Sequence, residues 1–389
     1  MSKWPIFSRE EQDAALRVLQ SGKVNYWTGQ EGRLFEVEFA EYLGVNHAVA
    51  VSNGTVALEL CLRALDIGYG DEVIVTSRTF LASATAIINC GAIPIFADVD
   101  LNSQNITVKS ISAVKTNKAK AVIAVHLAGW PCDMPKIMSY AQQNNLFVIE
   151  DCAQAHGASI DGKKVGGFGD ISAFSFCQDK IMTTGGEGGM VVTNNKDLWE
   201  KSWSYKDHGK SYDAVYHVDH PPGFRWLHKS FGTNFRMTEM QAAIGRLQLR
   251  KLDNWVSIRN KNANIFREYL LKLPFVEIPK CPNNYVHSYY KCYAFIKKDS
   301  LPVNWSRDYL MAKFNEQGML CYSGSCSEIY LEDCFSSHPS RPVKRLKNAK
   351  LLGERSLMFL CDPTVDSSKL EEELSHIINK IMDGLGGVG

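Results

Sequence analysis

Two short apolar runs near the middle of the chain each lead to a chemically reactive side chain. The run 146–149 is followed at once by the carboxylates Glu150 and Asp151, and the run 171–176 is followed four residues later by Lys180. Apolar runs of this length between polar or glycine-rich segments are typical of buried strands. Parallel strands end at one edge of a sheet, and ligands bind there. We therefore expect the acid and the lysine to leave neighbouring strands on the same side.

The first two thirds of the chain alternate between strand and helix patterns. Further strands are expected at 48–51, 72–76, 93–97 and 121–125, and helices at 34–43, 56–65, 80–90 and 133–144. This alternation predicts an α/β fold with a mostly parallel central sheet. A long helical segment and three prolines then precede a second α/β pattern, with a strand at 289–296 and helices at 306–317 and 368–382. We expect a large domain, 1–251, and a smaller C-terminal α/β domain, 252–389.

Composition excludes several classes of protein. A net charge of +1 offers no electrostatic basis for binding nucleic acid or an anionic membrane. No apolar run approaches the roughly 20 residues that span a bilayer, and the charged N-terminal segment is unlike a signal peptide, so a cytoplasmic location is expected. None of the 11 cysteines forms a CxxC pair, which favours free thiols over a metal site or disulfides.

A lysine and a carboxylate presented together suit one cofactor, pyridoxal phosphate. This cofactor needs a lysine that holds its aldehyde as a Schiff base. It also needs an acid that keeps the pyridine nitrogen protonated, so that the ring can accept electrons. We assign Lys180 to the first role and Asp151 to the second.

The segment Ser52-Asn53-Gly54-Thr55 joins a predicted strand to a predicted helix and is the candidate phosphate site. Backbone N–H groups at a helix start, together with the helix dipole, favour an anion there, so Gly54 and Thr55 are expected to contact the phosphate. Ordinary helix capping is the alternative. Phe80 follows another strand end, where its ring could stack on the pyridine ring; a place in the core is the alternative.

These motifs resemble those of a known enzyme family, the DegT/DnrJ/EryC1/StrS sugar aminotransferases, which have the type I pyridoxal-phosphate transferase fold. The resemblance runs from Gly29 to about Leu249. It is densest in EDCAQAHG (150–157), in Phe174-Ser175-Phe176 with Lys180, in GEGG (186–189) and in GTNFRMTE (232–239). Each of the four pieces alone is common, so the evidence for the resemblance is their order and spacing.

The resemblance implies a role for each of several residues around the cofactor. Gln154 would contact the phenolic oxygen, Ser175 would contact the phosphate, and Phe80 would stack on the ring. Asn234 would reach the phosphate of the neighbouring subunit's cofactor. The last role implies a homodimer with shared active sites.

Four further residues are candidates for contact with the substrate. His156 could touch substrate or orient Asp151, and a structural histidine is the alternative. Lys206 and His208 lie in an aromatic and basic segment, 201–231, that could supply cations and ring faces to a nucleotide diphosphate. A loop packed across a dimer interface is the alternative there. His287 matches a position where the family often has a substrate-facing histidine.

The resemblance also implies a reaction. The amino group of L-glutamate would pass to a nucleotide-linked 4-keto-6-deoxy sugar, either dTDP-4-keto-6-deoxyglucose or UDP-2-acetamido-4-keto-2,6-dideoxyhexose, for the O-antigen of lipopolysaccharide or another bacterial surface glycan. The alternatives are a 3-keto sugar aminotransferase, a pyridoxal-phosphate-dependent sugar dehydratase and a non-catalytic protein of the same fold. Lys180 argues against the dehydratase, in which histidine replaces the lysine.

Overall fold

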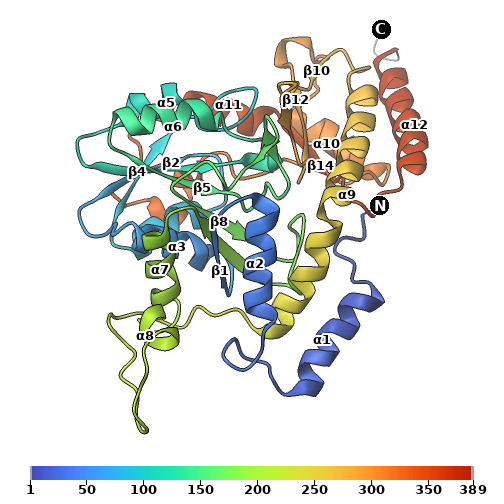
Figure 1. Ribbon diagram of the computed structural model, residues 1–389. Coiled ribbons are helices and arrows are strands. Elements are labelled where there is room, and N and C mark those ends of the chain that lie inside the picture. The colour runs from blue at the N-terminus through green and yellow to red at the C-terminus, as the bar shows by residue number, and fades with distance from the viewer. Residues whose placement is uncertain (1, 387–389) are drawn as a thin grey trace.

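The computed structural model describes residues 2–386, and its centre is a seven-stranded sheet (Figure 1). The strand order is β1-β9-β8-β5-β4-β2-β3. The bounds are β1 His47–Val51, β2 Glu72–Thr76, β3 Ile93–Ala97, β4 Ala119–Val125, β5 Phe147–Asp151, β8 Ile171–Ser175 and β9 Gly189–Thr193. Strand β9 runs antiparallel to its neighbours β1 and β8, and the other neighbouring pairs are parallel, so the predicted, mostly parallel sheet is confirmed.

Helices cover both faces of this sheet because alternate strand residues point to opposite sides. Val73 and Ile123 pack in one buried cluster with residues of α3 and α4, whereas Ile74 and Val122 pack in another with residues of α5 and α6. The covering helices are α3 Gly54–Ala64, α4 Ala82–Asn89 and α7 Lys196–Tyr205 on one face, and α5 Val108–Val114 and α6 Met134–Gln143 on the other. In Figure 1, α5 and α6 lie above the sheet and α3 and α7 lie below it.

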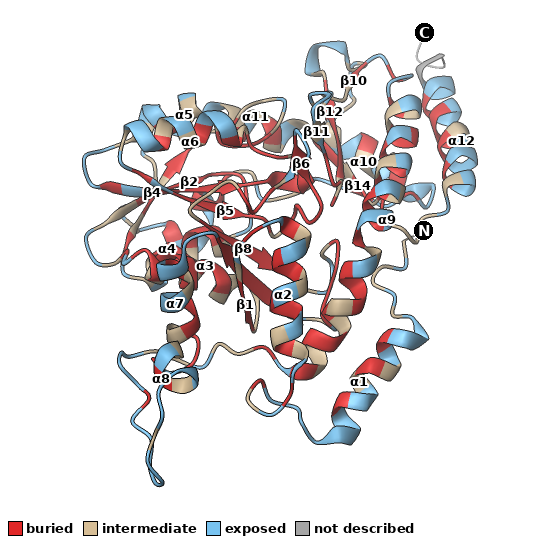
Figure 2. Cartoon of the chain, viewed as in Figure 1, coloured by how far each residue is buried: buried red, intermediate tan, exposed pale blue. Residues whose placement is uncertain are grey.

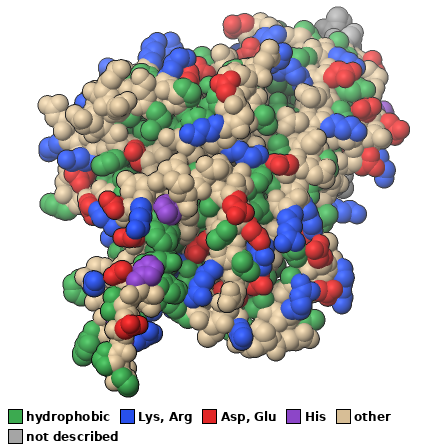
Figure 3. All heavy atoms as spheres, viewed as in Figure 1, with side chains coloured by type: hydrophobic (Ala, Val, Ile, Leu, Met, Phe, Trp, Pro, Cys, Tyr) green, Lys and Arg blue, Asp and Glu red, His purple; other side chains and the backbone are tan. Residues whose placement is uncertain are grey.

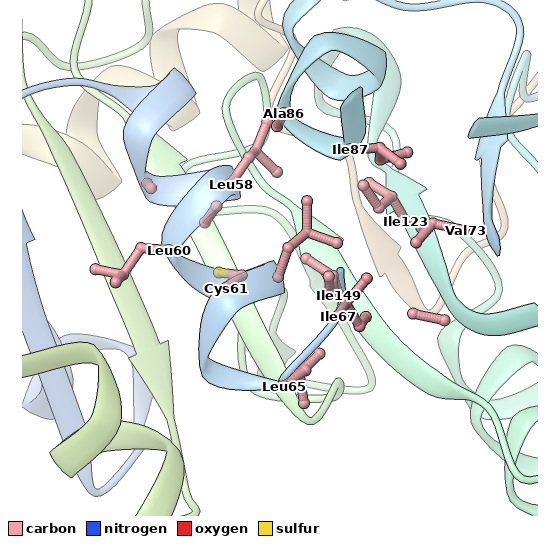
Figure 4. Close-up of a cluster of buried hydrophobic side chains, with 14 of the residues drawn as sticks. Leu58, Leu60, Cys61, Leu65, Ile67, Val73, Ala86, Ile87, Ile123 and Ile149 are labelled. Carbon is pink, nitrogen blue, oxygen red and sulfur yellow. The ribbon is translucent and has the colours of Figure 1, made fainter. Parts of the chain in front are cut away.

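Helix α3 is held against the sheet by a continuous apolar face. Figure 4 shows Leu58 and Cys61 of α3, and Leu65 directly after the helix, in one buried cluster with Ile123 and Ile149 of the strands. All five side chains are buried, the most exposed being Leu65 at 7%. This packing fixes the N-terminus of α3 at the carboxyl edge of the sheet, where the strands β5 and β8 end.

A single long helix, α9 Glu239–Leu270, joins the two parts of the chain. Its first half packs on α1 Arg9–Ser21 and α2 Glu31–Leu43, and its second half packs on α12 Ser367–Gly386. The predicted boundary at residue 252 falls inside this helix, which continues without a break. The division into domains therefore stays a prediction, with a helix rather than a linker at the junction.

The C-terminal part has its own sheet and its own buried cluster. The strand order is β10-β12-β14-β13, and the cluster consists of residues between Ala263 and Ile381. The bounds are β10 Val276–Glu277, β12 Cys292–Ile296, β13 Cys321–Tyr322, β14 Ser356–Phe359, α10 Arg307–Glu316 and α11 Lys347–Arg355. In a third, small sheet, the central strand β6 Ser159–Ile160 pairs with β11 Tyr285–Val286 and with β7 Lys163–Lys164. Figure 2 shows buried residues concentrated on the strands and on the inward faces of the helices.

An arm after α8 Tyr212–Tyr216 extends away from the body at the lower left of Figure 1. It carries Phe224, Trp226 and Phe231, which are 77%, 83% and 98% exposed. Over the face in Figure 3, positive and negative side chains are interspersed, while hydrophobic side chains gather on the protruding arm. Within residues 2–386, no helix combines the length and the apolar character that crossing a membrane requires.

Candidate active site

A cavity of about 980 Å³ lies at the carboxyl edge of the central sheet. Its volume is at the upper end of the range usual for small-molecule sites. Seven of the residues predicted to hold the cofactor line it together: Gly54, Thr55, Phe80, Asp151, Gln154, Ser175 and Lys180. The C-terminal part closes the other side with Arg259 of α9 and with residues such as Tyr290 and Lys291. The cavity is thus built between the central sheet and the C-terminal part.

Asp151 ends strand β5 at the cavity wall and is only 4% exposed. Its Oδ2 accepts a hydrogen bond from the Ser83 hydroxyl at 2.8 Å, and its Oδ1 accepts one from the Ala153 N–H at 3.1 Å. Burial raises the pKa of this carboxyl, while these two donors and the charge of Lys180 oppose the rise. A cation placed against Asp151 would lower the pKa and stabilise the ionised form.

Lys180 lies in the loop after β8, and neighbouring side chains hold its amine. Its Nζ lies 3.5 Å from the Tyr290 hydroxyl and 3.5 Å from Oδ1 of Asp179. Tyr290 also donates a hydrogen bond to Asp179. On the backbone side, Trp4 Nε1 donates to the Lys180 carbonyl at 2.8 Å. The lysine is therefore fixed at both ends, with its amine in the cavity that Asp151 lines.

The backbone at the start of α3 lies very close to Ser175 at the end of β8. A Cβ atom added at Gly54 would lie 2.5 Å from the Ser175 Cβ, so only glycine fits here. The Asn53 side chain caps the helix by accepting from the Val56 N–H at 3.0 Å. The N–H groups of Gly54 and Thr55 belong to the first turn, which has no intrahelical acceptors for them. They and the Ser175 hydroxyl are suited to hold a phosphate.

Phe80 and Gln154 present a ring face and an amide to the same cavity. The Phe80 side chain is 70% exposed although it is aromatic, because it lines the cavity rather than the core. Gln154 is buried, and its Oε1 accepts from the Ala128 N–H at 2.8 Å. This bond fixes the orientation of the amide and leaves its Nε2 as the donor for a ligand oxygen.

The second carboxylate of the motif, Glu150, has a structural position below the cavity. It accepts from His126 Nε2 at 3.0 Å and from the N–H groups of Gly166 and Gly169 at 3.0 and 2.7 Å. Burial alone would raise its pKa, but these donors outweigh burial and lower the pKa. His126, Glu150 and Cys152 have ligand atoms within 4.8 Å of one another, a spacing compatible with a metal. Both ring nitrogens of His126 already have partners, since Nδ1 accepts from the Cys132 N–H.

The structure does not place His156 or His287 on the cavity wall. His156 is 1% exposed and packs against the rings of Phe174 and Phe176, with centroids 5.4 and 5.7 Å away. Burial, and then the charge of Lys180, lowers its pKa to about 3. His287 stacks on Tyr289 at 3.8 Å, and burial lowers its pKa to about 3. Neither histidine lines the cavity of this chain, and both ring nitrogens of His156 lack a hydrogen-bond partner among the described residues, so the substrate roles of His156 and His287 stay predictions.

Lys206, His208 and Asn234 also lie outside the cavity of this chain. The Lys206 ammonium is fully buried, 3.0 Å from Oε1 of Glu36 and 3.7 Å from the centroid of the Tyr26 ring. Its charge is therefore neutralised within the fold rather than offered to a substrate. His208 and Asn234 are exposed at the surface. Asn234 is positioned by an isolated bridge to Asp207, away from the cavity that Gly54 and Ser175 line.

Sequence reasoning missed the residues that orient the two reactive groups. Ser83, which binds Asp151, lies 68 residues before it, and Tyr290, which binds Lys180, lies 110 residues after it. No local motif marks either residue. The neighbouring segment His287–Tyr290 was singled out by the resemblance, but for the histidine and not for the tyrosine.

Comparison with known families agrees with this geometry. The model of the DegT/DnrJ/EryC1/StrS aminotransferase family matches residues 5–381. The chain belongs to this family. The match extends well beyond the segment 29–249 that carries the resemblance, and it includes the C-terminal part that closes the cavity. The family consists of pyridoxal-phosphate-dependent enzymes.

Individual relatives agree in fold and in chemistry. The solved structure of an aminotransferase from Psychrobacter cryohalolentis is 53% identical, with a TM-score of 0.96 over 98% of this chain and 99% of that one. The GDP-perosamine synthase of Escherichia coli O157:H7 is 40% identical over 316 residues, 80% of this chain and 83% of the relative. A UDP-N-acetyl-3-dehydro-alpha-D-glucosamine 3-aminotransferase of Acidithiobacillus ferrooxidans is 43% identical over 263 residues, 68% of each chain. The predicted family, fold and enzyme class, that of the nucleotide-sugar aminotransferases, are confirmed.

Proposed function

We propose that the protein transfers the amino group of L-glutamate to a nucleotide-linked 4-keto-6-deoxy sugar, with pyridoxal phosphate held at Lys180. One observation carries the proposal: Asp151 and Lys180 line the same cavity as Gly54 and Ser175. An acid, an amine and an anion site at one sheet edge are the three groups that this cofactor requires.

The residues present fit the cofactor. The close approach of Gly54 to Ser175 leaves the backbone N–H groups of α3 to hold the phosphate. Asp151 would hold the protonated ring nitrogen, Phe80 would cover one ring face, and the Gln154 amide would donate to the phenolic oxygen. When bound, pyridoxal phosphate supplies the electron sink that stabilises negative charge at the donor's α-carbon.

The chain's own residues would then bind and move protons. The Lys180 amine would act as a general base and acid, taking the proton from the donor's α-carbon and delivering it to C4′ of the cofactor. Tyr290, 3.5 Å from Nζ of Lys180, would keep that amine directed into the cavity. Buried Asp151 would stabilise positive charge on the ring nitrogen more strongly than an exposed acid could.

The acceptor sugar is proposed from the relatives and from the family resemblance. Relatives named for GDP-linked and UDP-linked sugars are about equally similar to this chain, at 40% and 43% identity. The proposal therefore extends to GDP-linked sugars beside the dTDP-linked and UDP-linked ones. A place in the biosynthesis of O-antigen or another surface glycan, in the cytoplasm, is part of the same proposal.

We also propose a homodimer with shared active sites. Asn234 is exposed and lies outside the cavity of its own chain. This position suits a residue that reaches the cofactor phosphate of a second subunit, as the resemblance implies. Analytical ultracentrifugation of the purified protein tests the dimer.

A spectroscopic experiment tests the cofactor, and a substrate panel tests the acceptor. Added pyridoxal phosphate should give an absorbance band near the visible edge that borohydride removes together with activity. Lys180→Ala should abolish both the band and the turnover, and the control Lys272→Met should keep them. The acceptor follows from turnover of dTDP-, UDP- and GDP-linked keto sugars with L-glutamate, with product identification by NMR. Retained turnover in Lys180→Ala would disprove the assignment of the base.

A further inference from the structure

Two cations beside Lys180 form a positively charged corner of the cavity. Lys291 and Arg259 both line the cavity together with Lys180. The ammonium groups of Lys180 and Lys291 lie 5.0 and 4.6 Å from the centroid of the Tyr290 ring. The two ammonium groups are therefore within about 10 Å of each other. Lys291 is half-buried and Arg259 is 1% exposed, so solvent screens neither charge fully.

Neither cation forms an ion pair within the described residues, although the charges of Asp179 and Asp362 act on Lys291 and Arg259 from farther away. Among residues 2–386, no carboxylate lies within 4.0 Å of Lys291 or Arg259, whereas Asp179 is already paired with Lys180. Burial lowers the pKa of Lys291. The charges of Arg259 and Lys180 also lower this pKa, whereas the charge of Asp179 raises it. Asp362 shares this wall without an ion pair to either cation, and its Oδ1 accepts from the N–H of Thr364 at 3.0 Å.

The Arg259 guanidinium is incompletely bonded although it is buried. Its Nη1 donates to the carbonyls of Tyr289 and Tyr290 at 3.3 and 3.4 Å, and its Nε and Nη2 have no acceptor among the described residues. A buried cation with unpaired donors is destabilising unless an acceptor such as an anion joins it. Such an arrangement is typical of a site that is completed by its ligand.

We propose that Lys291, with Arg259 behind it, binds the α-carboxylate of the amino donor. This inference rests on the proposed function. The α-carboxylate is bonded directly to the carbon whose proton Lys180 removes, so its counter-charge must lie close to Lys180. The phosphates of a nucleotide sugar are separated from the reacting carbon by the sugar ring, which places them farther along the cavity. A lysine and an arginine together neutralise a carboxylate through charge-assisted hydrogen bonds.

Lys291→Met tests the inference, because it keeps the length of the side chain and removes the charge. Lys272→Met is the matched control: Lys272 also lies over a tyrosine ring, 3.9 Å from the Tyr269 centroid, but it does not line the cavity. The probe is 2-oxoglutarate, which has the carboxylates of the donor but no amine and cannot react with the cofactor-loaded enzyme. Calorimetry measures its Kd, and the Kd values of GDP, UDP and dTDP form the second arm.

We expect Lys291→Met to weaken 2-oxoglutarate binding at least tenfold, because one charge-assisted hydrogen bond is lost. The Kd of the preferred nucleotide should stay within twofold, and Lys272→Met should change neither value. Weakened nucleotide binding with unchanged 2-oxoglutarate binding would assign the cations to the phosphates and overturn the inference. Unchanged binding of both, or no 2-oxoglutarate binding by the wild type, would overturn it too.

The absorbance band of the loaded enzyme separates this result from the proposed function. If no band forms with pyridoxal phosphate, the proposed function fails. If the band forms in both the wild type and Lys291→Met, the change in Kd for 2-oxoglutarate bears on the carboxylate site alone.

Discussion

Replacing Asp151 by asparagine should separate cofactor chemistry from stability. The change removes the charge and keeps the shape. In the variant, the amide oxygen can still accept from the Ala153 N–H, and the amide nitrogen can donate to Ser83, whose hydroxyl also lies 3.0 Å from the Thr79 hydroxyl. The hydrogen bonds around residue 151 can therefore all be kept, and the fold should be too.

The expected loss follows from the burial of the acid. Asp151 is 4% exposed, and removing one partner of a buried ion pair costs about 3–5 kcal/mol. This cost corresponds to a loss of roughly 200-fold to 5,000-fold in the rate of the glutamate half-reaction. The half-reaction is measured in a single turnover, from the absorbance change when L-glutamate is added to the loaded enzyme.

The cofactor-free variant should be at least as stable as the wild type. Burial raises the pKa of Asp151, so the folded protein binds this proton more tightly than the unfolded chain does. The stability that this group contributes is present at low pH and is lost as the pH rises through the raised pKa. At pH 7 the carboxylate therefore destabilises the cofactor-free fold, and asparagine removes that cost. Urea unfolding of the cofactor-free proteins at pH 7 measures the difference.

A second aspartate, directly before β8, provides the control. Burial also raises the pKa of Asp170, which accepts from the Val148 N–H at 2.7 Å but does not line the cavity. Asp170→Asn should leave the half-reaction within about threefold of the wild type, because no contact with the cofactor changes. A half-reaction in Asp151→Asn within tenfold of the wild type would refute the assignment of the acid.

Three further predictions concern single contacts. Gly54→Ala would place a Cβ 2.5 Å from the Ser175 Cβ, so the Kd for pyridoxal phosphate should rise at least tenfold in an absorbance titration; an unchanged Kd would contradict the phosphate site. Ser83→Ala removes a donor that favours ionised Asp151, so the acidic limb of the half-reaction's pH profile should move to higher pH, and an unmoved limb would contradict this role. His156 has a pKa of about 3 when folded and about 6.5 when unfolded, so the unfolded chain binds the extra proton and stability falls as the pH decreases below 6.5. Between pH 7.5 and 5.0, urea unfolding of His156→Leu should show a loss about 2 kcal/mol smaller than that of the wild type, and an equal loss would contradict the burial of a neutral histidine.

The sequence alone predicted six of the seven strands of the central sheet, missing β9, and the two candidate reactive groups. Strands β2 and β3 were predicted with their observed bounds, and β1, β4, β5 and β8 were predicted to within two residues at each end. Asp151 and Lys180 could be assigned because both follow buried apolar runs, and a run of apolar residues is a local signal. The predicted C-terminal strand began at 289, three residues before β12 begins at Cys292. The two tyrosines before Cys292 have the composition of a strand, but Tyr290 lines the cavity and Tyr289 packs against the C-terminal cluster.

Only the tertiary structure decided which other residues reach the cavity. Lys206 and His156 look chemically competent in sequence, yet Glu36 neutralises the first and two phenylalanines bury the second. Tyr290 and Lys291 become part of the site because β12 and α9 close over the edge of the central sheet. Periodicity reports the environment of a residue along its own helix or strand. It carries no information on which distant side chain completes a hydrogen bond or leaves a buried charge without a partner.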